Sequence, residues 1–181
     1  MKGQSVKSSQ ESRAVAHSTT QGINAVQCYP AVAQFKGGKK TLGIQAPQQA
    51  QPNWCWAAAC SVIVGQTQQF LANQFVGGRD EQFDPVNVLN TYLKFGSEKN
   101  GKIPWDTLVD EVDAGRPVIL LFGPKKDAHY ILVTGYDGNS NRDKNRKYVI
   151  SDPDNGGNPQ PLTSEELGNY RGNFIGYYLV I

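Results

Sequence analysis

The sequence contains no apolar run that approaches the roughly 18 residues needed to cross a bilayer. Its N-terminus also lacks the charged-then-apolar pattern of a secretory signal peptide. Only three cysteines are present, too few for a disulfide framework, and their odd number leaves at least one thiol unpaired. The net charge of +2 indicates neither nucleic acid nor an anionic membrane as a partner. We therefore expect a protein that binds neither.

The first 27 residues are poor in apolar side chains and rich in Ser, Thr, Gln and Lys. A segment of this composition cannot bury enough surface to order itself. We predict a disordered tail over residues 1–27 and one folded domain over residues 28–181, a length that suits a single domain. His17 lies in the tail, which offers no scaffold to fix a catalytic imidazole. His129 is the other of the two histidines.

Helix signals come first in the domain and strand signals come second, an order typical of an α+β fold. After a basic glycine turn at residues 36–40, the sequence predicts helices over residues 54–64, 66–76 and 86–95 and a fourth from Pro104 to Gly115. Apolar runs predict strands over residues 117–122, 129–136, 147–152 and 174–181. An exposed hairpin loop is expected at residues 137–146, a tight turn at 152–157 and a short capped helix after Thr163.

The first predicted helix carries a cysteine at its start. Asn53 is a good N-cap because its side-chain oxygen can accept the free amides of the first turn. Cys55 then stands at about the second helical position, where unpaired amides and the helix dipole favour a thiolate, the nucleophilic form. The alternative is a packing role, since cysteine is among the most buried residue types. Cys28 and Cys60 are either inert reduced thiols, which we favour, or a disulfide that leaves Cys55 free.

A thiol nucleophile needs a base, and the base needs an orienting group. His129, at the head of a predicted strand, is the candidate base, although a lone histidine is often only a satisfied polar residue. Asp152 is the candidate orienter, because an antiparallel partner strand returns the chain to the vicinity of His129. Its alternative role is to cap the turn that follows it. Asp154 and Asp137 are weaker candidates.

Acyl transfer also requires donors that stabilise an oxyanion. The backbone N–H of Cys55 and a side-chain amide just upstream are suited to this role. Gln48, Gln49 and Gln51 are all within reach along the chain, although glutamines here can equally be a solvated loop.

The set of motifs resembles the papain-like cysteine proteases. The resemblance rests on the order Gln-Cys-His-Asp, on Trp-Cys-Trp-Ala-Ala in an apolar helix (residues 54–58), on Gly-Arg-Pro-Val-Ile-Leu (115–120) before His-Tyr-Ile-Leu-Val-Thr-Gly-Tyr (129–136), and on Val-Ile-Ser-Asp-Pro (149–153). It covers about residues 42–181. The chain is most similar to the compact bacterial branch, which includes type III effector proteases and double-glycine leader peptidases.

The resemblance implies a helical N-terminal half with the nucleophile on the central helix, and an antiparallel sheet half at the C-terminus. It implies Cys55 as nucleophile, His129 as base and Asp152 as orienter. Papain has its amide glutamine six positions before the cysteine, which matches Gln49, and the looser spacing in the bacterial branch keeps Gln48 as the alternative. Papain's orienter is an asparagine, whereas the effector branch has aspartate, as this sequence does.

We therefore predict a monomeric thiol endopeptidase that hydrolyses protein or peptide substrates through an acyl-enzyme, without metal or cofactor. Trp54, Trp56 and Tyr130 are predicted to wall the substrate groove, with a plain core position as the alternative for Trp54 and Tyr130. Trp105 is predicted to belong to the core. The resemblance suggests a bacterial effector or virulence protein secreted by a non-classical route and acting on a host protein, with a cytoplasmic location as the alternative. Alternative functions are glutamine deamidation or transglutamination by the same triad, and an inactive papain-like binding module.

Overall fold

The apolar runs at residues 117–122 and 129–136 form the centre of a seven-stranded antiparallel sheet. The structure, a computed structural model, describes residues 37–124, 127–138 and 144–181, which lie in one unit that runs from Gln34 to Ile181. The predicted disordered tail, His17 and Cys28 lie outside the described residues, as do residues 139–143 of the predicted hairpin loop.

The sheet has the strand order β2-β7-β3-β4-β5-β6, and β1 pairs with the second half of β4. The strands are β1 (Gly38–Thr41), β2 (Phe95–Asn100), β3 (Val118–Phe122), β4 (His129–Gly138), β5 (Lys147–Ser151), β6 (Pro159–Thr163) and β7 (Phe174–Val180). The predicted strands at β3, β4, β5 and β7 are confirmed. The strands β1, β2 and β6 were not predicted from the sequence.

In the part of the chain that the structure describes, five helices accompany the sheet, namely α1 (Cys55–Val64), α2 (Gln68–Val76), α3 (Pro85–Thr91), α4 (Trp105–Asp113) and α5 (Ser164–Asn169), together with a 3-10 turn, η2 (Pro153–Asn155). The caps follow from local sequence. Asp84 accepts from the amide of Val86 with Pro85 at the first helical position of α3. Thr163 and Glu166 form a reciprocal capping box at the start of α5.

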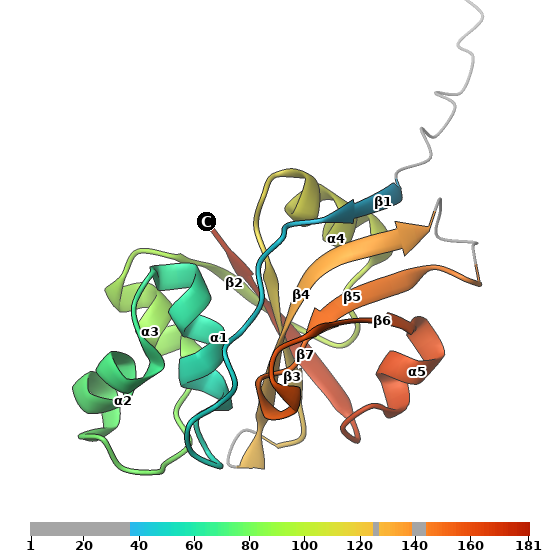
Figure 1. The fold of residues 1–181 in the computed structure, drawn as a ribbon. Helices are drawn as coiled ribbons and strands as arrows, with labels where there is room; N and C mark the ends of the chain where they lie inside the picture. Colours follow the sequence, from blue (N-terminus) through green and yellow to red (C-terminus); the bar gives the residue numbers. More distant parts are fainter. Residues whose placement is uncertain (1–36, 125–126, 139–143) are drawn as a thin grey trace, which may run out of the picture. The chain divides into compact units, whose positions relative to one another are not determined.

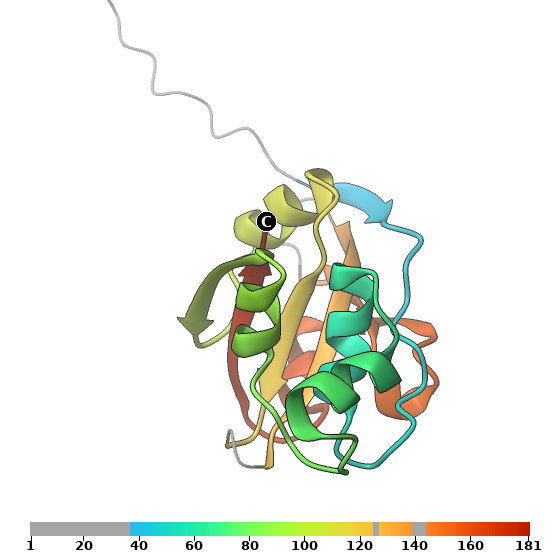
Figure 2. The ribbon, with the colours of Figure 1, turned by 90° about the vertical axis from the view of Figure 1, so that its left-hand side faces the viewer.

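Both faces of the sheet are covered, which explains why β3 is apolar throughout. Ile119 and Leu121 pack on the side of α1, α2 and α3, whereas Val118, Leu120 and Phe122 pack on the side of α4 and α5. Figure 1 shows α1, α2 and α3 together beside the sheet, and Figure 2 shows them in front of its strands. The fold is therefore α+β, with a helical half that carries Cys55 and a sheet half that carries His129 and Asp152.

Two predicted elements are wrong because strand pairing overrides the local signal. The segment expected to be a basic glycine turn contains β1, whose residues Gly38 and Thr41 pair with Gly138 and Gly135. The helix expected to reach Phe95 ends at Thr91 instead. The chain then turns into β2, which pairs with β7.

The predicted N-cap at Asn53 is also wrong. Trp54 occupies the cap position of α1 and makes no side-chain capping hydrogen bond. Asn53 is instead bound to the loop after α2: its backbone amide donates to Asp80 Oδ1 (2.8 Å) and its side-chain amide donates to the Asp80 carbonyl (3.2 Å). Among the described residues, no helix is both long and apolar enough to span a membrane.

Candidate active site

Cys55 is the first residue of α1 and is only 1% exposed. A turn precedes it, in which the amide of Trp54 donates to the Gln51 carbonyl (3.1 Å), and the first helical hydrogen bond runs from Ala58 N–H to the Trp54 carbonyl. The amides of the first turn therefore remain free of partners within the helix. The Cys55 thiol contacts the backbone carbonyl oxygen of Ala128 at 3.6 Å. This contact brings the start of α1 against the residue that precedes His129.

His129 begins β4 and Asp152 directly follows β5. The two strands are antiparallel neighbours, with Leu132 opposite Ser151. This register brings the two side chains together: His129 Nε2 lies 2.7 Å from Asp152 Oδ1. The Cys55 thiol also interacts with the imidazole and helps to raise its pKa. Because Nε2 faces Asp152, the ring nitrogen left for Cys55 is Nδ1.

Opposing effects act on the pKa of each partner. Burial has the largest effect on His129 and lowers its pKa, but the hydrogen bonds and charges of Asp152 and Cys55 together raise it to about 9. Burial is also the largest effect on Asp152 and raises its pKa, but His129, the Asp154 amide and Arg171 lower it to about 2. Between these values the pair consists of an imidazolium and a carboxylate.

Arg171 completes the surroundings of Asp152 and was not predicted from the sequence. It lies between α5 and β7 and donates to Asp152 Oδ2 from Nε (3.0 Å) and from Nη2 (2.8 Å). Its third nitrogen, Nη1, lies 2.9 Å from Asp154 Oδ2. No local motif marks this arginine, because its partners lie 17 and 19 residues earlier in the chain.

The two weaker orienter candidates lie in different places. Asp137 is near the end of β4, at the far end of the hairpin, and pairs with Lys39 (3.6 Å). Asp154 is close to the site and donates its backbone amide to Asp152 Oδ1 (2.9 Å). Of the three aspartates, Asp152 is the one whose carboxylate contacts His129.

The glutamine-rich loop before α1 lies beside this pair. Gln49 Nε2 donates to the Pro52 carbonyl (2.7 Å), and its Oε1 is buried without a partner among the described residues. An amide nitrogen carries two hydrogens, so one remains available as a donor. Gln48 and Gln51 are exposed. Gln68, at the start of α2, binds both the Gln48 carbonyl (2.7 Å) and the Ala50 amide (2.9 Å), which holds the loop in place.

A second network joins the glutamine loop to the turn after Asp152. The amide of Ala46 donates to Ser151 Oγ (2.8 Å), and this hydroxyl donates to the Gly157 carbonyl (2.6 Å). Gly157 has a left-handed backbone, with φ of 70°, and a methyl group there would overlap the Ala46 carbonyl oxygen. The amide of Gln49 also donates to the Pro153 carbonyl (2.9 Å). The loop and the turn are therefore fixed to each other.

An open cavity of about 350 Å³ lies at this junction. It is lined by Gln48, Gln49, Ala50, Gln51, Pro52, His129 and Asp154. The His129 side chain is 19% exposed. The cavity therefore leads from solvent to the imidazole, and its walls are mostly polar.

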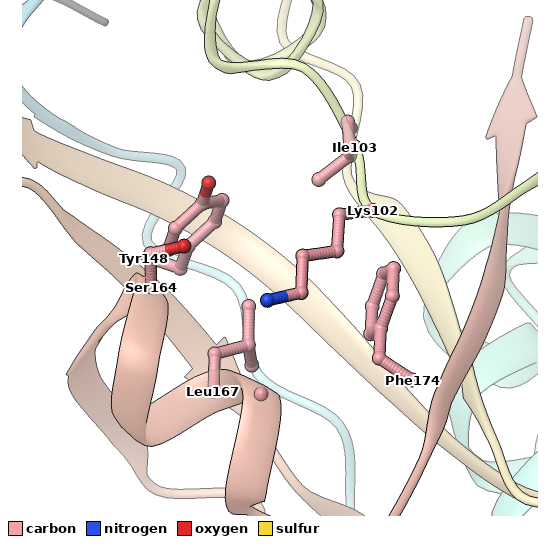
Figure 3. A pocket seen from close by; sticks show the side chains of 7 residues that line it. Lys102, Ile103, Tyr148, Ser164, Leu167 and Phe174 are labelled. Carbon is pink, nitrogen blue, oxygen red and sulfur yellow. The ribbon is translucent and has the colours of Figure 1, made fainter. Parts of the chain in front are cut away.

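A second cavity lies between α5 and the loop before α4. Figure 3 shows the Lys102 side chain between Leu167 and Phe174 in this cavity. Its volume of about 10 Å³ is that of a single water molecule, so it cannot hold a substrate.

The three side chains predicted to wall a groove are buried instead. Trp54 and Tyr130 are 1% exposed and Trp56 is fully buried, which contradicts that prediction. The two indoles bind backbone through Nε1, Trp54 to the Arg79 carbonyl (2.9 Å) and Trp56 to the Glu81 carbonyl (3.0 Å). They secure the loop after α2 against the start of α1. Trp105 belongs to the core, as predicted.

The other described cysteine differs from Cys55 in its surroundings. Cys60 is a buried thiol in the middle of α1, and burial, followed by the charges of Asp84 and Cys55, raises its pKa. Within the described ranges, no group of three or more His, Cys, Asp or Glu side chains is placed to hold a metal ion.

The structure thus brings a thiol, an imidazole and a carboxylate together from three separate parts of the chain. Comparison with curated proteins finds no match to this sequence. A family profile described as "Peptidase_C39 like family" matches residues 29–178, which is most of the chain. The chain therefore belongs to the Peptidase_C39 like family and is a papain-like cysteine protease of the C39 type.

Proposed function

We propose that this protein is a thiol endopeptidase whose catalytic residues are Cys55, His129 and Asp152. The observation that carries the proposal is the position of His129, which binds Asp152 through Nε2 and interacts with the Cys55 thiol through the same ring. A nucleophile and a base in hydrogen-bond contact, with the base oriented by a third group, is the arrangement that covalent acyl transfer requires.

In the proposed reaction the His129 imidazolium already carries the proton taken from the Cys55 thiol, and Sγ attacks the carbonyl carbon of the scissile peptide as a thiolate. A carbon–sulfur bond forms and the carbonyl electron pair moves to oxygen. When the intermediate collapses, the carbon–nitrogen bond breaks and the imidazolium protonates the leaving amine. A water molecule, deprotonated by His129, then attacks the thioester, which releases the acid and regenerates the thiol.

Gln49 is the side chain that best suits the oxyanion. Pro52 holds its amide nitrogen in place through one hydrogen, and the second can donate to the developing negative charge. Gln48 is the weaker candidate because its side chain is exposed and its amide contacts the Asp154 carbonyl at 3.4 Å. The backbone amide of Cys55, in the first turn of α1, is the natural second donor.

The cavity beside His129 is the proposed binding site for the part of the substrate next to the scissile bond. Its walls consist largely of amide side chains and backbone, with one carboxylate, Asp154. Such walls favour an extended polypeptide whose own amides and carbonyls can be paired, because buried polar groups require partners. This supports a protein or peptide substrate.

Incubation of the pure protein with a denatured protein mixture tests the proposal. The wild type should generate new N-termini, detected by mass spectrometry, and Cys55→Ala should generate none. Cys60→Ala is the matched control, since it removes a thiol from the same helix and should retain cleavage. Ammonia release without new N-termini would instead indicate a deamidase, and neither product would indicate a binding module.

The resemblance to effector proteases supports a further part of the proposal, namely that the protein acts on a host protein after secretion by a non-classical route. The alternative is action inside the producing cell. Comparison of culture supernatants from secretion-competent and secretion-deficient cells tests it. We expect the protein only in the supernatant of the secretion-competent cells. Retention of the protein inside the cells of both strains would contradict secretion.

A further inference from the structure

We infer that Arg171 is a positioning residue of the catalytic site, which fixes the Asp152 carboxylate so that Oδ1 stays on His129. The inference rests on the proposed triad and adds a fourth member to it. Its basis is that the two oxygens of the Asp152 carboxylate have different partners. Oδ1 binds His129 Nε2 and the Asp154 amide, whereas Oδ2 accepts two hydrogen bonds from Arg171.

The geometry determines what Arg171 can do. Its Nε and Nη2 both donate to the same oxygen, at 3.0 and 2.8 Å, so the plane of the guanidinium defines where Oδ2 lies. Once Oδ2 is fixed, rotation about the Cβ–Cγ bond of Asp152 would break these bonds, and Oδ1 therefore remains directed at His129. A lysine at this position would supply the charge but not the planar pair of donors.

Burial makes this contact important. Asp152 is 2% exposed, so water cannot replace a lost donor easily. A buried carboxylate that loses a charged partner either rotates toward another donor or binds a proton. Both outcomes would weaken its hold on the imidazole. The hydroxyl of Tyr170 also interacts with Asp152, and this neutral group cannot replace the positive charge of Arg171.

Arg171 also connects the triad to the wall of the cavity. Its Nη1 lies 2.9 Å from Asp154 Oδ2, and Asp154 lines the cavity beside His129. Its Nη2 reaches Asn155 Oδ1 at 3.5 Å, so the arginine contacts two of the three residues of η2. The guanidinium lies over the Tyr170 ring, 5.4 Å from its centroid, which orients the arginine in turn. The groups around the carboxylate are therefore His129, Asp154, Tyr170 and Arg171, and Cys55 faces the imidazole.

The test compares Arg171→Ala and Arg171→Lys with the wild type. We expect Arg171→Ala to lower kcat about 10- to 100-fold. A loss of this size is typical when a hydrogen-bond partner that orients a site residue is removed. The acid limb of the kcat/KM profile should move to higher pH. The reason is that removal of the nearby positive charge makes deprotonation of the Asp152 carboxyl group harder. Arg171→Lys should restore the acid limb and only part of kcat. Arg116→Ala is the matched control, because Arg116 forms a similar two-pronged pair, with Glu111. This variant should leave kcat and the acid limb of the kcat/KM profile unchanged.

A second readout does not depend on activity. The chain contains two histidines, so the imidazole protons of His129 can be assigned by NMR with His17→Gln as reference. A downfield Nε2 proton on Asp152 should be present in wild type and in Arg116→Ala, and should shift upfield or disappear in Arg171→Ala. An unchanged resonance and pH profile in Arg171→Ala would overturn the inference. If the resonance changes in Arg171→Ala but the wild type cleaves no peptide, the proposed function alone would be overturned.

Discussion

Replacement of Asp152 by asparagine should destabilise the protein in a manner that depends on pH. The substitution keeps the shape of the side chain but removes the charge that binds His129. The pKa of Asp152 is lowered from 3.8 to about 2, and that of His129 is raised from 6.5 to about 9. Each pKa unit corresponds to about 1.4 kcal/mol, so these changes correspond to about 2 and about 3 kcal/mol. Both shifts contain the His129–Asp152 interaction, but Cys55 also acts on His129, and the Asp154 amide and Arg171 also act on Asp152. The two values are therefore not added, and about 2–3 kcal/mol is the upper bound for the pair.

The directions of the two pKa shifts define the pH range in which the Asp152–His129 pair stabilises the protein. The lowered pKa of Asp152 contributes stability that is present above pH 3.8 and lost as the pH falls toward 2. The raised pKa of His129 contributes stability that is present below pH 6.5 and lost as the pH rises through 9. The difference in unfolding free energy between wild type and Asp152→Asn should therefore be greatest between about pH 4 and 6.5. It should shrink by at most about 2–3 kcal/mol by pH 9.

Urea unfolding followed by tryptophan fluorescence measures this difference, because all three tryptophans are buried. Asp137→Asn is the control: it makes the same chemical change at an exposed ion pair, which contributes about 0–1 kcal/mol. A difference for Asp152→Asn that stays flat between pH 4 and 9, or that grows with pH, would refute the reasoning.

Three further predictions concern the loop and core that support the site. Gln49→Ala should lower kcat by about 10²- to 10³-fold, as loss of one oxyanion donor does, whereas Gln48→Ala should change it little. Comparable losses in steady-state kinetics for both variants would reject Gln49 as the donor. Gly157→Ala should cost about 1–2 kcal/mol for its left-handed backbone, plus the overlap with the Ala46 carbonyl, and should also reduce activity. Wild-type urea stability in that variant would be the contrary result. Trp56→Ala should lower the unfolding free energy by about 3–5 kcal/mol, because it empties a core position next to Phe83, and a loss below about 1 kcal/mol in urea would contradict this packing.

The elements that the sequence predicted correctly are those with local signals. Asp84-Pro85 and Thr163 with Glu166 mark their helix starts by side-chain caps that need no distant partner. The apolar runs of β3 and β4 are buried on both faces, so their composition alone indicates strands.

The strands that were missed depend on distant partners. β2 has the largely polar sequence Phe-Gly-Ser-Glu-Lys-Asn, and β6 contains two prolines, so neither carries a strand signal. Each lies at an edge of the sheet and is extended because it pairs with β7 or β5. The same limit explains the error at Asn53. Its two nitrogens donate to Asp80, 27 positions away, and its side-chain oxygen accepts from Gln82 Nε2 (3.5 Å).

The candidate site shows the same division. Cys55, His129 and Asp152 could be proposed from residue type and order, since few groups in the chain can serve as nucleophile or base. Arg171 and Gln68 could not, because their roles come from contacts with segments that only the fold brings near. The buried tryptophans were misassigned for a related reason: aromatic residues next to a nucleophile suit a groove and a core equally well in sequence.

The rate at which iodoacetamide alkylates Cys55 tests the central claim most directly, namely that His129 and Asp152 activate this thiol. Mass spectrometry can follow the labelling of Cys55 and of Cys60, the buried thiol of the same helix, in one sample. At mildly acidic pH we expect Cys55 to react much faster than Cys60 in the wild type, and this advantage to be lost in His129→Ala. Equal labelling of Cys55 in the wild type and in His129→Ala would contradict the account.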